Sequence, residues 1–488
     1  MEARKILRKA TLFFKLERIV PLAVIVIVSW QLFIPPVLGL ADNGDFARML
    51  VHFDLTHAPG DRADQYFAFL DRHYTIDPAK ARTYSLPDSF SSEILFAACA
   101  FGLSRLFGNT WFDLVWLGAV HVAALGAAVV LLICSTRTFA SRLRAIAFIA
   151  GSIVLTDIAY IAYFNSFYSE SATLLFFVTV AACAYGAMSS LLRRMIWLAA
   201  YFVAVAALLL AKYQNVVLLP VFLVFGGLLV KRWGEVRYLQ AYVVLALAAC
   251  YGGYLYFISA PEAADDAVLY NSVFNGILVD SPAPGDDLAS LGLDRNLARY
   301  AGSSAFQPDS LRFNPDFLQK FRQQVTIGGI FRFYLARPGR LIAALNRSVS
   351  LAFELRPKLG NYEPRTGHPP LNLSQSWAMW SSFRTAILPR NLWFCVVVGM
   401  LYLGLLARSW LRQKSDSARL NLEWSALIPV MALAQLVVIS ISDGISDLTK
   451  HAYLFNLLFD YMLVALLTYL IAWFFSVSKS DEARGELA

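Results

Sequence analysis

Long apolar runs recur along the chain, separated mostly by short polar connections. A bilayer core about 30 Å thick needs roughly 20 apolar residues per helix. We therefore predict a membrane-spanning helix in each of ten runs: 19–40, 111–135, 143–163, 170–189, 195–211, 214–230, 238–259, 391–408, 423–442 and 452–475. The runs 195–211 and 214–230 are short and almost contiguous, which favours a tight helical hairpin. The pattern predicts an all-α polytopic membrane protein.

Lysine and arginine residues fall at alternate ends of the predicted spans. The basic sites are the N-terminal stretch and every second connection, with Arg4, Lys5, Arg8, Lys9, Lys15 and Arg18; Arg137, Arg142 and Arg144; Arg193 and Arg194; Lys231, Arg232 and Arg237; and Arg408, Arg412, Lys414 and Arg419. The intervening short connections contain only Lys212 and Lys450. Because basic residues favour cytoplasmic loops, we predict that both termini are cytoplasmic.

This topology divides the chain into five parts. They are a basic cytoplasmic N-terminus (1–18), a module of seven spans that includes a long outer loop at 41–110 (19–259), a large extracytoplasmic loop (260–390), a module of three spans (391–475) and a cytoplasmic tail (476–488). The first apolar run is too long for the core of a signal peptide, so we interpret it as an uncleaved span. Loops as long as the two outer ones are usually functional.

Both outer loops contain stretches that suit the membrane surface. The run 91–108 is apolar, but it is short and interrupted by Gly102, which favours an interfacial or re-entrant helix over a span. In the second loop, "FLQKFRQQVTIGGIFRFYLARPGRLIAAL" mixes basic and aromatic residues at helical intervals. We therefore predict interfacial helices in both loops.

Composition supports a protein built for lipid. Of 488 residues, 58% are hydrophobic and 16% are charged, whereas soluble domains have about 25% charged residues. The net charge of +8 lies in short loops between apolar runs, which indicates membrane topology and not nucleic-acid binding. The five cysteines form no CxxC or metal-type spacing, so we expect them to pack.

The unusual polar residues gather at the predicted outer face. They are Asp42, Asp45, Arg48, Glu93, Asp157, Glu170, Lys212, Gln214, Asp443, Asp447, Lys450, His451 and Asp460. The cytoplasmic side has only the basic flanks that the topology requires. Acids and bases collected on one face indicate an active site that opens outward.

The stretch "DNGD" places Asp42 and Asp45 at the outer edge of the first run. In a helix, positions three apart are neighbours, so both carboxylates would face the same way. One interpretation is that Asp42 or Asn43 caps an interfacial helix that runs through Phe46 and Leu50, with Asp45 reinforcing the cap. The other is that one of the two carboxylates is a general base at the boundary between water and lipid. Two carboxylates would also suit a divalent metal, although they specify one weakly, and we predict no cofactor.

Four cations on the same face would suit a phosphate. Lys212 departs from the positive-inside pattern, which either snorkelling to the interface or pairing with a phosphate would explain. Lys450 and His451 recur on this face. Together with Arg48 they would clamp a phosphate or pyrophosphate.

Three acids have both structural and functional interpretations. Glu93 begins the short apolar run, where an acid favours the helix dipole. Glu170 closes the aromatic stretch "YFNSFYSE", which would serve either as an interfacial belt or as a stacking surface for a sugar. Asp460 lies about two turns inside its span and needs a partner there, whether its role is structural or direct.

Several motifs together resemble the GT-C superfamily of membrane glycosyltransferases. These are "DNGDFAR", "YFNSFYSE", "VFNGILVDSP", "LGNYE" and "SDLTKHAYLFNLLFD", spread over residues 39–460. More narrowly, they resemble bacterial hexose transferases of S-layer and cell-surface glycan biosynthesis. The resemblance implies a multi-pass enzyme of the bacterial inner membrane. It would transfer a sugar from a polyprenyl-phosphate donor to a glycan or lipid-linked acceptor on the outer face, with inversion.

The resemblance also implies roles for residues. Asp42 or Asp45 would be the general base, and Arg48, Lys212, Lys450 and His451 would hold the donor phosphate. Further substrate-binding candidates are Glu93, Glu170, Gln214, Asp447 and Asp460. Many enzymes of this kind with monophosphate donors need no metal. The sugar, the acceptor, the linkage and the partner proteins are not specified by the sequence.

Two other functions compete with glycosyl transfer. A transporter or flippase of lipid-linked sugars predicts ionisable residues through the depth of the membrane, often with an internal repeat. Only Asp460 lies plainly within a predicted span, and no repeat is evident. A non-catalytic envelope scaffold predicts that the outer acids tolerate replacement.

Overall fold

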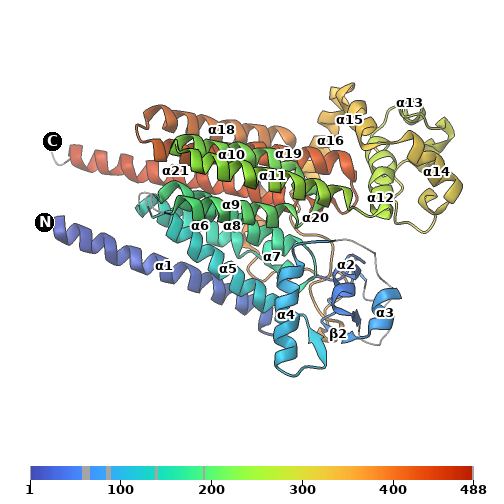
Figure 1. Ribbon diagram of the computed structural model, residues 1–488, viewed down its shortest axis with the longest axis horizontal. Coiled ribbons are helices and arrows are strands. Elements are labelled where there is room, and N and C mark those ends of the chain that lie inside the picture. Colours follow the sequence, from blue (N-terminus) through green and yellow to red (C-terminus); the bar gives the residue numbers. More distant parts are fainter. Residues whose placement is uncertain (1, 58–65, 84–89, 138–140, 191–192, 486–488) are drawn as a thin grey trace.

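The computed structural model describes residues 2–57, 66–83, 90–137, 141–190 and 193–485, in some places by backbone alone. Helices dominate the architecture (Figure 1). Among the described residues, seven helices are long and apolar enough to cross a membrane, or eight if one bent pair counts as a span. The predicted all-α polytopic membrane fold is confirmed.

All ten predicted runs coincide with helical structure. The seven long helices are α5 (Val115–Ser135), α8 (Glu170–Ser189), η3 with α10 (Tyr213–Leu218 and Leu219–Trp233), α11 (Val236–Ile258), α18 (Leu392–Arg412), α19 (Asp416–Ser442) and α21 (Tyr453–Gly485). The bent pair consists of α6 (Ser141–Leu155), followed by α7 (Ile158–Ile161) and η2 (Ala162–Asn165). The other two runs correspond to α1 (Glu2–Phe33) and α9 (Arg194–Leu209), whose apolar parts are shorter.

The first run ends earlier than its hydrophobicity predicts. We expected the helix to span 19–40, but α1 stops at Phe33. Pro35 and Pro36 follow, and proline lacks the N–H that would continue the helical hydrogen bonding. Residues 34–41 therefore leave the bundle as non-helical chain and lead directly into the DNGD stretch.

The run 143–163 is likewise not one straight helix. Its two parts meet at an angle of 59°, and Asp157 lies at the break. The Asp157 carboxylate accepts hydrogen bonds from the N–H groups of Ala159 and Ser381, both at 2.9 Å. It therefore caps the second part and ties the bend to the second loop.

The first long loop contains a small sheet that the sequence pattern did not predict. Strands β1 (Leu55–His57), β2 (His73–Ile76) and β3 (Trp111–Asp113) pair antiparallel in that order, with His57 opposite Tyr74. The helices of this loop are α2 (Ala47–Leu50), η1 (Val51–Phe53), α3 (Pro78–Thr83) and α4 (Ile94–Leu106). Helix α4 corresponds to the short apolar run predicted at 91–108.

The second long loop has a hydrophobic core of its own, formed around Tyr270, Phe274, Phe321 and Phe333. Its elements are α12 (Glu262–Ser272), the single π-helical turn η4 (Val273–Ile277), α13 (Pro284–Ser290), η5 (Arg295–Tyr300), η6 (Leu311–Phe313), α14 (Pro315–Gln324), α15 (Ile327–Leu335), α16 (Pro338–Ala352), η7 (Pro364–Thr366) and α17 (Met379–Ile387). This loop is thus a folded subdomain.

Helix α15 has the two-sided character expected of an interfacial helix. Ile327, Phe331 and Leu335 are exposed along one face, whereas Ile330 and Phe333 are buried on the other. An exposed apolar stripe of this kind suits the boundary between headgroups and acyl chains.

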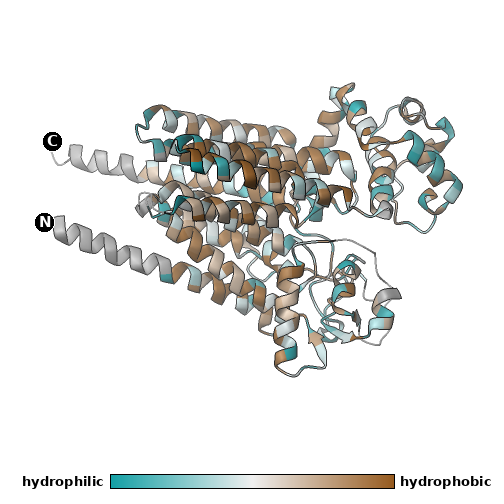
Figure 2. Ribbon diagram, viewed as in Figure 1, coloured by the Kyte–Doolittle hydropathy of each residue, from teal (hydrophilic) through white to brown (hydrophobic). Residues whose placement is uncertain are grey.

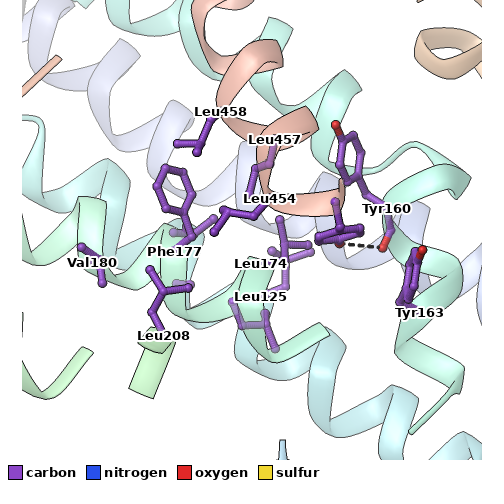
Figure 3. Close-up of a cluster of buried hydrophobic side chains, with 14 of the residues drawn as sticks. Leu125, Tyr160, Tyr163, Leu174, Phe177, Val180, Leu208, Leu454, Leu457 and Leu458 are labelled. Carbon is purple, nitrogen blue, oxygen red and sulfur yellow. Dashed lines mark hydrogen bonds between the residues drawn. The ribbon is translucent and has the colours of Figure 1, made fainter. Parts of the chain in front are cut away.

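The core of the bundle lies where α5, α8, α9 and α21 meet. Figure 3 shows Leu125, Leu174, Leu208 and Leu458 as members of one cluster of buried side chains to which these helices contribute. All four side chains are fully buried. Helix α8 is the central element, because 89% of its apolar window is buried inside the protein. It brings Glu170, at its first turn, to the loop end of the bundle.

Both chain ends lie at one end of the bundle, and both long loops lie at the other (Figure 1). Figure 2 shows apolar residues along the bundle and the most hydrophilic segments in the second loop. The side chains of most of the predicted N-terminal segment 1–18 and tail 476–488 lie outside the described residues. The DNGD stretch leads directly into α2 and therefore lies at the loop end of the bundle (Figure 1).

Candidate functional site

Asp42 organises the DNGD turn. Its Oδ1 accepts hydrogen bonds from the N–H groups of Gly44 at 2.7 Å and of Phe46 at 3.2 Å. Gly44 has a φ of +103°, a conformation that side chains disfavour. Only 5% of the Asp42 side chain is exposed. Asp42 therefore holds the turn that precedes α2, but it does not cap this helix, whose N-cap residue is Phe46 and receives no side-chain cap.

Asp45 contacts different residues from those that Asp42 contacts. One of its oxygens lies 3.2 Å from the Arg48 guanidinium, and the other accepts a hydrogen bond from Lys450 Nζ. The Asp45 side chain is 30% exposed. The two aspartates share no side-chain partner among the described contacts, although they are three residues apart.

Lys450 is the central cation of the site. It belongs to the single-turn helix α20 (Leu448–His451), and its side chain is only 3% exposed. Besides Asp45, its Nζ contacts Asp447 at 3.2 Å and lies 5.0 Å from the centre of the Tyr168 ring. The ammonium thus sits between two carboxylates and an aromatic face.

Asp45 and Lys450 each stabilise the charged form of the other. Burial alone would raise the pKa of Asp45, but Lys450 and Arg48 outweigh it and hold that pKa well below its usual value. Burial alone would lower the pKa of Lys450, but Asp45, Asp447 and Glu170 outweigh it and raise that pKa above its usual value. Both groups are therefore charged across the neutral range.

Asn43 and Tyr168 join the DNGD turn to neighbouring elements. Asn43 Nδ2 donates to Asp447 at 2.7 Å, which links the first loop to α20. The Tyr168 hydroxyl donates to the carbonyl of Ala41 at 2.8 Å and accepts from the N–H of Asn43 at 3.0 Å. Burial raises the pKa of Tyr168 well above its ordinary value, so the phenol stays neutral.

Glu170 and Lys212 form a neighbouring ion pair. Lys212 Nζ lies 2.5 Å from Glu170 Oε1, and their side chains are 16% and 2% exposed. Lys212 therefore turns inward and pairs with an acid, and it does not extend to solvent as snorkelling requires. The negative charge of Glu170 also acts on Lys450.

His451 and Gln214 connect α20 to η3. Gln214 Nε2 donates to the backbone carbonyl of His451 at 2.8 Å. His451 Nε2 lies 3.3 Å from Asp443, whose other oxygen accepts from Asn271 Nδ2 at 2.7 Å. These contacts extend the polar network from the spans to α12 of the second loop.

Glu93 lies apart from the exposed cluster. It is fully buried, with one oxygen 2.8 Å from His121 Nε2 and the other accepting from the N–H of Ala172 at 3.1 Å. His121 Nδ1 is in turn 2.9 Å from the carbonyl of Phe164. Both Glu93 oxygens are therefore occupied within the bundle.

Asp460 is also enclosed, inside the span α21. Its carboxylate lies 2.8 Å from Arg384 and accepts hydrogen bonds from Tyr160 at 2.5 Å and Trp380 at 2.7 Å. Neither Asp460 nor Arg384 has exposed side-chain surface. The partner that an acid at this depth requires is thus Arg384, which the sequence analysis did not single out.

Sequence reasoning also missed His57 and Asp71. His57 Nδ1 contacts Asp71, and its Nε2 lies 3.5 Å from Asp42 Oδ2. All three side chains are mostly buried. The only signal was the presence of His57 in the first outer loop, where no periodic pattern marked a strand. These residues support the Asp42 end of the turn.

The exposed end of the cluster combines cations with a carboxylate. Among the residues that the structure describes, no group of three or more His, Cys, Asp or Glu residues is arranged to hold a metal ion. The exposed end of the cluster instead presents Arg48 and Asp45 beside Lys450. A cation and a carboxylate in contact are suited to holding an anion and accepting a proton at neighbouring points.

The comparisons with known proteins agree with the fold. One family model, described as "YfdI N-terminal transmembrane domain", matches residues 3–487. No curated protein matches the chain, and no solved structure matches it. Because the match covers almost the entire sequence, the chain belongs to the family of YfdI N-terminal transmembrane domains.

Proposed function

We propose that the protein is a membrane glycosyltransferase, which moves a sugar from a polyprenyl-phosphate donor to a glycan or lipid-linked acceptor. The family is one of GT-C-like membrane glycosyltransferases, and this supports the reaction class. The observation that carries the proposal is the contact of Asp45 with the nearly buried Lys450 at the loop end of the bundle. We place this site at the outer face of the bacterial inner membrane, with both termini cytoplasmic.

Asp45 is the better candidate for the general base. Asp42 is 5% exposed and its Oδ1 holds the turn, whereas Asp45 is 30% exposed. An acceptor hydroxyl therefore has easier access to Asp45. Asp42 then acts as a positioning residue, which fixes the turn that carries the base.

The reaction is a single displacement with inversion. The acceptor hydroxyl oxygen attacks the anomeric carbon, and its proton passes to Asp45. The bond between the anomeric carbon and the phosphate oxygen breaks, so negative charge grows on the departing polyprenyl phosphate. Lys450 and Arg48 stabilise that charge.

The same cations couple donor binding to the strength of the base. In the free protein Lys450 holds the pKa of Asp45 low, which makes Asp45 a weak base. A donor phosphate that binds Lys450 would break the contact between Lys450 and Asp45, and the pKa of Asp45 would then rise toward its ordinary value. The donor thus prepares the site for the acceptor.

The test compares two isosteric variants in purified protein reconstituted into nanodiscs. Transfer of radiolabelled hexose is measured from undecaprenyl-phosphate glucose, galactose or mannose to the envelope glycan. We expect Asp45→Asn to lower the rate by about 100-fold or more, the usual contribution of a general base. Asp42→Asn keeps an acceptor oxygen for the turn, and we expect it to lose about tenfold at most. If Asp45→Asn keeps its rate while Asp42→Asn loses it, the base assignment is reversed.

A flippase of lipid-linked sugars is the alternative function. The buried pairs Arg384–Asp460 and Glu93–His121 place ionisable groups among the helices of the bundle, as a transporter would. Their partners are fixed, however, and neither pair opens to the surface. A flippase would move a fluorescent polyprenyl-phosphate sugar between leaflets without forming a new glycosidic bond.

A further inference from the structure

A hollow of about 700 Å³ opens on the second loop, away from the spans. Its lining residues are Arg299, Tyr300, Ala301, Gly302, Ser303, Gln307 and Asp309. They follow one another along the chain at the end of η5, and we call this feature the 299–309 hollow. It is wide and shallow, which suits a segment of a polymer better than an enclosed small molecule.

The charged residues of the hollow are not committed to ion pairs. Elsewhere in the subdomain arginine and aspartate pair closely, as in Arg322–Asp266 at 2.5 Å and Arg340–Asp287 at 2.8 Å. Among the described residues, Arg299 and Asp309 have no such ion pair. Both are exposed, so their hydrogen-bonding groups are available to a ligand.

The chemistry of the lining suits a neutral, polyhydroxylated ligand. Arg299 offers donors, Asp309 offers acceptors, and Gln307 has both kinds of atom. The Arg299 guanidinium lies 5.1 Å from the centre of the Tyr300 ring, so an aromatic surface adjoins the polar groups. One positive and one negative side chain do not form the cationic patch that a nucleic acid or a lipid phosphate requires.

The loop that forms the hollow is held in place from below. The Tyr270 hydroxyl is 2.7 Å from Ser303 Oγ, and the N–H of Gly302 donates to the carbonyl of Phe274 at 2.7 Å. Gly302 has a φ of +84°. Binding to such a loop loses little conformational entropy, because the loop is already ordered.

Asn271 links this loop to the proposed transfer site. Its Oδ1 accepts from the N–H of Ala305 at 2.7 Å, and its Nδ2 donates to Asp443 at 2.7 Å. Asp443 in turn lies 3.3 Å from His451, the neighbour of Lys450. The loop that forms the hollow and the segment that carries α20 therefore share Asn271 and Asp443 as common supports.

From these observations we infer that the 299–309 hollow binds the acceptor glycan. The inference rests on the proposed function, because it gives the hollow the acceptor of that reaction. The occupant is a neutral stretch of polysaccharide, held by Arg299, Asp309 and the Tyr300 ring. Its terminal hydroxyl would extend toward Asp45, while the donor approaches through the lipid.

The test measures glycan binding separately from transfer. Envelope polysaccharide of the producing cell is cut into short oligosaccharides, labelled with a fluorophore and titrated onto the full-length protein in nanodiscs. Arg299→Ala and Asp309→Asn should each weaken binding by about tenfold, the size expected for one charge-assisted hydrogen bond. Both should raise the acceptor KM, with kcat and the donor KM unchanged. Arg332→Ala is the matched control, because Arg332 is exposed on α15 outside the hollow.

The two proposals fail in different ways. Unchanged oligosaccharide affinity in Arg299→Ala and Asp309→Asn overturns the inference, even if transfer proceeds. If both variants lose affinity for the oligosaccharide but the parent protein transfers no sugar, the glycan-binding site is supported and the proposed glycosyltransferase activity is rejected. Cross-linking of a photoreactive residue at position 307 to a polypeptide in membranes, and not to glycan, also overturns the inference. Because Asp309→Asn is isosteric, this variant still tests the inference if Arg299→Ala fails to fold.

Discussion

Replacing Lys450 with methionine removes the charge at the centre of the site and keeps most of the side-chain volume. The change leaves Asp45 and Asp447 without the ammonium that contacts both of them, while Glu170 keeps its ion pair with Lys212. Removing one member of a buried ion pair costs about 3–5 kcal/mol. Asp45 is partly exposed, so we expect a smaller loss of unfolding free energy, about 2–3 kcal/mol.

The same change should weaken donor binding. One charge-assisted hydrogen bond to phosphate contributes about 1.5–3 kcal/mol. Lys450 must leave Asp45 to make this bond, so the low end applies, and affinity should fall about tenfold. The assay is titration of undecaprenyl-phosphate glucose into nanodiscs that contain the parent or the variant, with thermal unfolding followed in parallel.

A second lysine provides the control for these measurements. Lys320→Met makes the same change on α14, where the lysine is exposed. This variant should bind donor and unfold as the parent does. The reasoning is refuted if Lys450→Met binds donor within twofold of the parent and unfolds at the same temperature.

Three other predictions concern stability. Arg384→Met leaves the fully buried Asp460 unpaired and should cost about 3–5 kcal/mol in thermal unfolding, with much of the loss recovered when Asp460→Leu is added; unfolding at the parent temperature would contradict this. Gly444→Ala, at a φ of +60° and with a Cβ site 2.2 Å from a carbonyl oxygen of η4, should cost at least about 1–2 kcal/mol, whereas Gly339→Ala in α16, with open space around it, should not. Folding raises the pKa of Lys450. The contribution of the charged Lys450 to the free energy of unfolding is therefore complete below the ordinary lysine pKa of about 10.4, and it is lost as the pH rises above that value. The difference in unfolding temperature between the parent and Lys450→Met should therefore be constant from about pH 5 to about pH 9 and should narrow above about pH 10.4; narrowing near neutrality would contradict the pairing.

Hydropathy was sufficient to locate the helices but not their breaks. All ten runs selected by the rule of about 20 apolar residues coincide with helices, because lipid requires backbone hydrogen bonds within each segment. The rule extended the first helix beyond Pro35, and it did not detect the bend at Asp157. Both breaks depend on very few residues inside otherwise apolar sequence. The three-stranded sheet was missed, because its strands are three or four residues long and lie far apart in the chain.

The sequence marked Asp45 and Lys450 as candidate residues, but it did not indicate that they are in contact. Asp45 was conspicuous at the edge of a span, and Lys450 was conspicuous because it departed from the basic-loop pattern. A single sequence does not indicate which connection between helices packs beside another, so the contact between Asp45 and Lys450 was not predicted. His57 gave no signal for the same reason, since its partner Asp71 is brought near by the small sheet.

The contact of Asp45 with Lys450 joins residues 405 positions apart. During synthesis Asp45 is therefore made long before Lys450. Until α20 is made, Asp45 has Arg48 as its basic partner but lacks Lys450, and the proposed donor site is incomplete. A product that stops before residue 450 would keep the DNGD turn and most of the spans, yet it could not bind the donor phosphate as proposed. On the proposed function, the connection that carries α20 is thus the part of the chain that completes the site.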